Sequence, residues 1–140
     1  MRIKNAEEKH IPFIKEAEAR IFSDGWSESA LCSHLASSAS RTLVAEEDGH
    51  MLGYLLGCVI LPEGEIYRVA SLPEARRRGV ATALLNAFLE ELPVCFLEVR
   101  QSNRAARALY EKHGFSLVAE RKNYYKAPAE DACIYKREIK

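Results

Sequence analysis

The spacing of apolar residues divides the first half of the chain into two helix-like and three strand-like segments. Apolar residues recur at helical spacing over residues 7–22, and Ser27 is a favourable N-cap for a second helix that ends near residue 35. Strand-like apolar runs follow at 41–47, 51–61 and 65–72. Asp48-Gly49 is a strong hairpin turn signal, and residues 62–64 form the next turn. These short connections predict three consecutive antiparallel strands.

The second half of the chain predicts a strand–helix–strand unit, a further helix and a final hairpin. The expected elements are a helix from Gly79 to residue 92, a strand at 94–99, a helix from Ser102 or Asn103 to Gly114, and strands at 115–120 and 132–139, with a loop at 123–128. A helix that joins two strands of one sheet makes a right-handed crossover. The strands at 65–72 and 94–99 are therefore expected to be parallel.

Together with a short strand at 2–5, these elements predict an α/β fold with a mixed sheet of about seven strands and about four helices. The run at 51–61 is apolar throughout, so we expect a central strand there, covered on both faces. No linker, repeat or low-complexity stretch interrupts the chain. Residues 1–140 are therefore expected to form a single domain.

Composition removes several classes of protein. Lys and Arg number 20 and Asp and Glu number 20, so the formal net charge is zero, and neither a nucleic-acid binder nor a membrane-surface protein is indicated. No apolar run reaches the roughly 18–20 residues that span a bilayer, and residues 1–9 lack the apolar core of a signal peptide, so a cytoplasmic protein is expected. The cysteines and histidines are dispersed, which favours buried, reduced thiols and no metal site.

The stretch from Ser71 to Thr82 carries the first candidate chemistry. It follows a strand and opens a helix, and it contains Gly79 behind the basic triplet 76–78. Free backbone N–H groups at a helix N-terminus attract anions, and a glycine lets the backbone approach a ligand closely. The pattern indicates a phosphate-binding loop. The alternative is a solvated basic turn that merely starts a helix.

The second candidate constellation lies at residues 97–115. Glu98 stands near the end of an apolar strand, Asn103 opens a helix, and Tyr110 follows seven positions later on the same helical face. Each also has a purely structural interpretation. Glu98 could pair with Arg100 or Arg104, Tyr110 could be an ordinary core aromatic, and Asn103 could be only an N-cap.

The two constellations occur in an order and spacing that strongly resemble the GNAT superfamily of N-acetyltransferases. The matching motifs are Arg76-x-x-Gly79-x-Ala81 and Glu98-Val99-Arg100-x-Ser102-Asn103. The likeness covers nearly the whole chain and is greatest to the RimI type, which acetylates the N-terminal amine of a ribosomal protein. It implies the GNAT fold, with a sheet that splays open between two central parallel strands. It also implies acetyl-CoA as co-substrate and a protein N-terminus as acceptor.

The resemblance also implies a role for individual residues. Glu98 would act as base towards the amine, directly or through a water, and Tyr110 would protonate the departing thiolate. Asn103 would contact the coenzyme through its side-chain amide. The remaining coenzyme-binding positions would be Val69, Ala70 and Ser71, through backbone groups, and Arg77, Arg78, Gly79, Val80, Ala81 and Thr82, around the pyrophosphate.

Three departures from the family pattern leave the acceptor open. These are Ser71 at the strand end, Arg68 where an uncharged polar residue is common, and a short link at residues 92–94. A lysine side chain or a small-molecule amine is an alternative acceptor, and a non-catalytic acyl-CoA-binding module is the alternative from another class. Trp26, Tyr124 and Tyr125 could line the acceptor cleft or serve packing. The sequence leaves the oligomeric state open.

Overall fold

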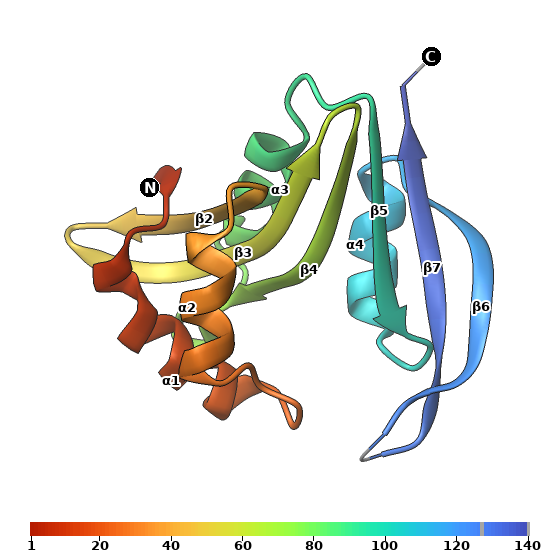
Figure 1. Ribbon diagram of the computed structural model, residues 1–140, viewed down its shortest axis with the longest axis horizontal. Helices are drawn as coiled ribbons and strands as arrows, with labels where there is room; N and C mark the ends of the chain where they lie inside the picture. Colours follow the sequence, from red (N-terminus) through yellow and green to blue (C-terminus); the bar gives the residue numbers. More distant parts are fainter. Residues whose placement is uncertain (127, 140) are drawn as a thin grey trace.

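The structure, a computed structural model, describes residues 1–126 and 128–139 and contains one mixed sheet in the order β1-β2-β3-β4-β5-β7-β6 (Figure 1). Its strands are β1 (Arg2–Asn5), β2 (Ser40–Glu47), β3 (His50–Ile60), β4 (Glu63–Ser71), β5 (Val94–Arg100), β6 (Ser116–Tyr125) and β7 (Glu130–Glu138). Its helices are α1 (Ile11–Ile21), α2 (Glu28–Ala36), α3 (Val80–Leu89) and α4 (Arg104–Lys112), with the 3₁₀ turns η1 (Glu8–His10) and η2 (Pro73–Ala75). The predicted mixed sheet and helices are confirmed.

Local signals set the boundaries in the first half of the chain. The Ser27 hydroxyl accepts a hydrogen bond from the Ala30 N–H at 3.1 Å and caps α2 as predicted. Pro12 lies in the first turn of α1, where its missing N–H breaks no helical bond. Asp48 (φ 52°) and Gly49 (φ 79°) both adopt the left-handed region, which is the two-residue hairpin geometry that Asp-Gly favours.

The helices cover both faces of the sheet. α1 and α2 lie on one face and α3 lies on the other (Figure 1). Leu84 and Phe88 of α3 belong to a core that includes Leu55 of β3, whereas Ile14 of α1 belongs to a core that includes Tyr54. Because successive residues of β3 enter opposite cores, its continuous apolar run is explained.

The central parallel strands pair over only part of their length. β4 and β5 are joined by the α3 crossover, and their register matches Glu63 through Ile66 with Val94 through Leu97. Beyond that point β4 continues to pair with β3 and β5 with β7, and the two strands diverge (Figure 1). The expected splay is present, and it frees backbone groups on the facing edges for another partner.

The prediction of a helix running from Gly79 to residue 92 was wrong at its end, because α3 stops at Leu89. Glu91 adopts a left-handed φ of 60° and turns the chain back towards the sheet. The turn buries Leu92 to 2% exposure. Leu92 fills the space beside Gly64, where a Cβ would lie 2.5 Å from its side chain. Tertiary burial of Leu92 therefore ended the helix before Pro93 required it.

Two strand boundaries also differ from the prediction. β4 begins at Glu63, so the turn predicted at 62–64 is completed earlier. β6 continues to Tyr125, so residues 123–125 of the predicted loop belong to a strand, while residue 127 lies outside the described residues. Asn123 adopts φ 53° at an irregularity in the register, and its N–H donates to Asp131 at 2.9 Å. The polar, exposed sequence of this edge strand hid it from a hydrophobic pattern.

Candidate active site

A cavity of about 510 Å³ opens where β4 and β5 part. The segment between α1 and α2, strands β4, β5 and β6, and helix α4 all contribute to its lining. Glu98, Asn103 and Tyr110, which were predicted from the sequence, all line it. The structure therefore brings the second constellation together in one hollow.

Glu98 projects from β5 with its side chain 25% exposed, and its nearest cation is Arg121 of β6, at 3.7 Å. A hydrogen bond to Glu98 raises the pKa of the Tyr124 hydroxyl, together with the burial of that tyrosine. The alternative partners Arg100 and Arg104 were wrong, because Arg100 pairs with Glu130 instead. Arg121 and Tyr124, which contact the Glu98 carboxylate, both belong to β6. The sequence alone could not place β6 beside Glu98.

Glu65 is a candidate functional residue that sequence reasoning missed. The parallel register sets Glu65 of β4 level with Phe96, two positions before Glu98, so both carboxylates point to one face of the sheet. Although the residue as a whole is exposed, burial of its carboxylate raises the pKa of Glu65, the charge of Glu98 raises it further, and Arg121 opposes both. The register of the two strands was the missing information.

Tyr110 meets both interpretations that the sequence allowed. Its ring is 7% exposed and meets Phe115 edge-on, with ring centroids 5.9 Å apart, so it is a core aromatic. It also lines the cavity, and within residues 1–126 and 128–139 its hydroxyl makes no hydrogen bond. Burial raises the pKa of Tyr110 to about 12. The hydroxyl therefore stays protonated at neutral pH and is available to a ligand.

Asn103 caps α4. Its side-chain oxygen accepts a hydrogen bond from the Ala106 N–H at 3.2 Å, so the N-cap interpretation is confirmed. The cap uses only the oxygen of the amide. Because Asn103 also lines the cavity, its NH₂ group remains a possible donor to a bound coenzyme.

The predicted phosphate loop lies exposed between η2 and α3. Arg77 (φ 66°) and Gly79 (φ 76°) adopt left-handed conformations that turn the chain into the helix. The Ala83 N–H makes the first helical bond, to the Gly79 carbonyl at 3.0 Å. The N–H groups of residues 80–82 therefore precede the helical hydrogen-bond pattern, as anion binding at a helix N-terminus requires.

The three arginines of this loop differ in their surroundings. Arg78 forms an ion pair with Glu47 of β2, which also lies 3.4 Å from the N-terminal amine. Arg76 and Arg77 are exposed and have no ion pair among the described residues. The structure therefore leaves Arg77 free to meet a phosphate, while Arg78 already shares a carboxylate. This distinction was invisible in the sequence.

Val69, Ala70 and Ser71 lie on the part of β4 beyond its pairing with β5. They pair with Leu55, Tyr54 and Gly53 of β3 on their other side. Their edge towards β5 carries no strand partner in the described register, which ends at Ile66. Backbone groups on that edge can accept an extended ligand such as a pantetheine arm.

Aromatic side chains form much of the remaining lining. Trp26, Tyr67, Tyr124 and Tyr125 all face the cavity. Trp26 contacts Tyr67 with ring centroids 5.9 Å apart, and Tyr124 meets Tyr125 at 5.1 Å. Tyr124 and Tyr125 therefore line the cavity, and Trp26 both lines it and packs against the core that includes Tyr54. Rings of this kind exclude water and offer flat contact surfaces to an acceptor.

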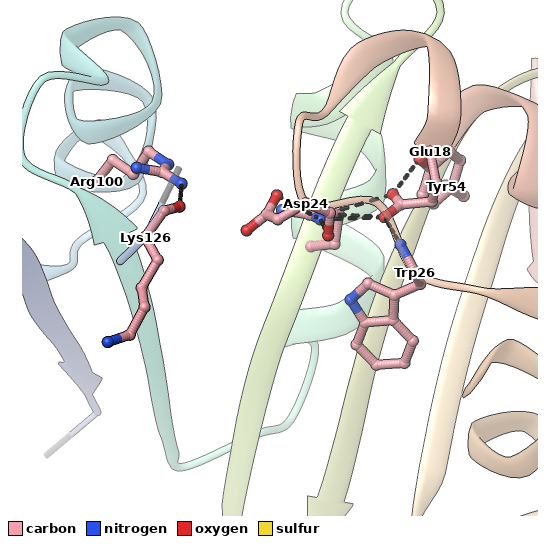
Figure 2. Close-up of polar contacts among 7 residues, drawn as sticks. Glu18, Asp24, Trp26, Tyr54, Arg100 and Lys126 are labelled. Atoms are coloured by element: carbon pink, nitrogen blue, oxygen red, sulfur yellow. Dashed lines mark hydrogen bonds and ion pairs between the residues drawn. The ribbon is translucent and has the colours of Figure 1, made fainter. Parts of the chain in front are cut away.

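A buried carboxylate organises the polar contacts beside the cavity (Figure 2). Glu18 of α1 is fully buried and accepts hydrogen bonds from the Tyr54 hydroxyl, the Trp26 N–H and the Arg68 guanidinium. Burial and the hydrogen bond to Glu18 raise the pKa of Tyr54. The network fixes the segment between α1 and α2 to β3 and β4. The sequence showed only a glutamate on an otherwise apolar helix face.

The remaining candidate groups have structural explanations. Cys95 and Cys133 are buried as expected, and burial raises the pKa of Cys95 to about 12. The expectation of burial was wrong for Cys32, which is exposed, and for Cys58, which is half-buried. In residues 1–126 and 128–139, no group of histidines, cysteines and acids has a metal-binding arrangement. None of the helices in the same residues is long and apolar enough to cross a membrane.

Comparison with known proteins identifies the family. Residues 11–115 match the model of the acetyltransferase (GNAT) family. The chain belongs to the GNAT family. It is 34% identical over 131 residues to the N-alpha-acetyltransferase RimI of Mycobacterium tuberculosis H37Rv, covering 88% of this chain and 83% of that one. The likeness to RimI-type enzymes expected from the motifs is thus confirmed.

Solved GNAT structures share the architecture. The ribosomal-protein-S18-alanine N-acetyltransferase from Escherichia coli superposes with a TM-score of 0.92 and 31% identity, over 99% of this chain and 93% of that one. Arabidopsis thaliana NAA60 in complex with acetyl-CoA gives a TM-score of 0.88 at 16% identity, over 99% of both chains. The second likeness shows the fold alone, in a protein solved with acetyl-CoA bound.

Proposed function

We propose that this chain is an acetyl-CoA-dependent N-acetyltransferase that transfers acetyl directly to the α-amine of a protein N-terminus. The observation that carries the proposal is that Glu98 and Tyr110 line one cavity at the point where β4 and β5 separate. The relatives named for ribosomal protein S18 alanine support an acceptor of the ribosomal-protein type. A single domain at residues 1–140 and a cytoplasmic location are part of the proposal.

The acceptor class follows from the strength of the available base. An amine must be neutral to attack a thioester, and a terminal α-amine has a pKa of roughly 7.7–8.0, against about 10.4 for lysine. At pH 7 about a tenth of the first is neutral but under about a thousandth of the second. The difference of about 2.5 units corresponds to roughly 3.4 kcal/mol. A carboxylate such as Glu98 is therefore better matched to an N-terminus than to a lysine side chain.

The two carboxylates and the tyrosine divide the work. Glu98 accepts the proton that leaves the amine, directly or through a water, while Glu65 adds negative charge that attracts the incoming ammonium form. Tyr110 donates a hydrogen bond and then its proton to the departing sulfur. The burial that raises the pKa of Tyr110 also raises the pKa of a thiol in the same place. The two pKa values therefore stay close enough for proton transfer.

The residues present fit acetyl-CoA as co-substrate, which supplies the activated acetyl group. The N–H groups at the start of α3 and the side chain of Arg77 would hold the pyrophosphate. The unpaired edge of β4 at Val69–Ser71 would hold the pantetheine arm, and the Asn103 amide would add a contact. Backbone N–H groups on that edge would also stabilise negative charge on the thioester oxygen.

A peptide panel tests the acceptor. One set carries free N-termini and no lysine, including a peptide from the start of the organism's own S18 protein. The matched set carries blocked N-termini and one lysine. Mass spectrometry with acetyl-CoA present locates the acetyl group. We expect transfer to the free N-termini only.

The other outcomes have distinct meanings. Transfer only to lysine would replace the proposal with a lysine acetyltransferase that needs a stronger base than Glu98. Transfer to neither set, with acetyl-CoA bound in calorimetry, would point to a small-molecule amine or to a non-catalytic acyl-CoA-binding module.

A further inference from the structure

Two arginines line the cavity just beyond the point where the parallel strands part. Arg68 belongs to β4 and Arg100 to β5. The last parallel pair is Ile66 with Leu97, so the two arginines emerge within one residue of the same level, on opposite sides of the opening. Each arginine contacts an acidic residue of a neighbouring element, Glu18 of α1 or Glu130 of β7, and backbone carbonyls of a connecting segment.

Arg68 holds the segment between α1 and α2. Its Nη2 donates to the Asp24 carbonyl at 3.2 Å and to the Asp24 carboxylate at 3.3 Å. Its guanidinium carbon lies 3.7 Å from the centre of the Phe22 ring. The fully buried carboxylate of Glu18 anchors the same guanidinium at 3.1 Å. It also accepts the Trp26 N–H at 3.0 Å (Figure 2). One buried ion pair thus fixes residues 22–26 in place.

Arg100 makes the same kinds of contact with Lys126 and Pro128, which lie between β6 and β7. Its Nη1 donates to the Pro128 carbonyl at 3.0 Å. Its Nη2 donates to the Lys126 carbonyl at 3.3 Å (Figure 2). Its guanidinium carbon lies 4.4 Å from the centre of the Tyr125 ring. Glu130 supplies the anchoring carboxylate at 3.4 Å. Each arginine therefore combines a carbonyl clamp, a stacked ring and an acidic anchor.

We propose that Arg68 and Arg100 are positioning residues that hold the two walls of the acceptor cleft. This role rests on the proposed N-acetyltransferase function, and it separates the residues that support acceptor binding from those that bind the coenzyme. Phe22, Trp26 and Tyr125 line the cavity from these walls, so loss of a clamp lets a ring move and weakens acceptor binding. The start of α3, which would bind the coenzyme pyrophosphate, makes no hydrogen bond, ion pair or ring contact with either arginine in the described residues.

The test compares variants of each arginine with a matched control. Arg68→Gln and Arg100→Gln remove the clamp, while Arg68→Lys and Arg100→Lys keep the charge beside the acidic anchor and lose only the planar fork. Arg41→Gln is the control, because Arg41 donates to the Ala87 and Phe88 carbonyls at 3.1 and 3.2 Å and stacks on Phe88 at 5.3 Å, away from the cavity. Steady-state kinetics give KM for the peptide and for acetyl-CoA separately.

We expect all four variants at Arg68 and Arg100 to raise the peptide KM by about tenfold or more, with the KM for acetyl-CoA within about twofold of the wild type. The Lys variants protect the test from a folding defect, since the buried Glu18 keeps a cation. Arg41→Gln is expected to leave both KM values unchanged. An unchanged peptide KM, or an equal rise in both KM values, would overturn the proposal.

Amide hydrogen exchange supplies a readout that does not depend on the acceptor. Arg68→Lys is expected to speed exchange at residues 22–26 and Arg100→Lys at residues 125–126, each without changing α3. Unchanged exchange rates at these segments would refute the clamps even if the peptide KM changed. If the wild type acetylates no peptide N-terminus, the proposed function is wrong. The exchange result then still decides whether each arginine holds its wall.

Discussion

Replacing Tyr110 by phenylalanine should separate catalysis from stability. The Tyr110 hydroxyl makes no hydrogen bond within the described residues, while its ring packs against Phe115. Removing the oxygen leaves the ring contacts intact, so we expect the free energy of unfolding to change by no more than about 0.5 kcal/mol. A lost general acid typically slows the chemical step by about 10²- to 10⁴-fold. That loss is equivalent to roughly 2.7–5.4 kcal/mol of barrier at 1.36 kcal/mol per decade.

Tyr135→Phe is the matched control. The Tyr135 hydroxyl accepts from Arg107 at 2.9 Å and donates to Glu111 at 2.8 Å, and the residue is fully buried. Its removal deletes two hydrogen bonds, each worth about 0.5–1.5 kcal/mol, so we expect a loss of about 1–3 kcal/mol in the free energy of unfolding with normal turnover per folded molecule. Urea denaturation measures the first quantity, and single-turnover acetyl transfer from acetyl-CoA to a peptide measures the second.

The pH dependence gives an independent check on Tyr110. Burial raises the pKa of Tyr110 to about 12, so the wild-type rate should not fall as the pH passes the ordinary tyrosine pKa of about 10. Turnover of Tyr110→Phe within about threefold of wild type would remove Tyr110 from the acid role. A fall in turnover that is accompanied by a comparable loss of folding free energy would instead mean that the hydroxyl has a structural partner.

Three further predictions concern charges around the cavity and the phosphate loop. Glu98→Gln should move the pH–rate profile towards alkaline pH, and NMR titration should show a lower pKa for Glu65 that still lies above its ordinary value, because burial persists. The pKa of Glu65 is raised in the folded state, so stability that is present at acidic pH is lost as Glu65 ionises. In urea titrations, Glu65→Gln should therefore be more stable than wild type at about pH 7 and equal to it near pH 4. Equal stability of the two proteins at both pH values would contradict this reasoning. Arg77→Ala should raise the KM for acetyl-CoA by about five- to tenfold. Arg78→Ala should raise this KM less, because Arg78 already pairs with Glu47. A larger rise for Arg78→Ala than for Arg77→Ala would refute the assignment.

Most secondary structure followed from local sequence. The helices at residues 11–21 and 28–36 and the Asp48-Gly49 hairpin depend on periodicity, a serine cap and turn chemistry, and all were predicted close to their bounds. The errors arose where distant groups decided. Leu92 ended α3 early by entering the core, and β6 extended through polar residues because its ladder to β7 needs no apolar pattern.

The chain's motifs were likewise enough to predict the family, and to suggest the phosphate loop and the candidate reacting groups Glu98 and Tyr110, because those features occupy short stretches with characteristic spacing. Only the tertiary structure set Glu65 near Glu98, since that depends on the parallel register. It alone also paired Arg78 with Glu47 and Arg68 with Glu18, partners 31 and 50 residues apart. Residue identity determines what a charge can do, whereas the partners that neutralise, orient or free it are set by the packing of distant strands and helices.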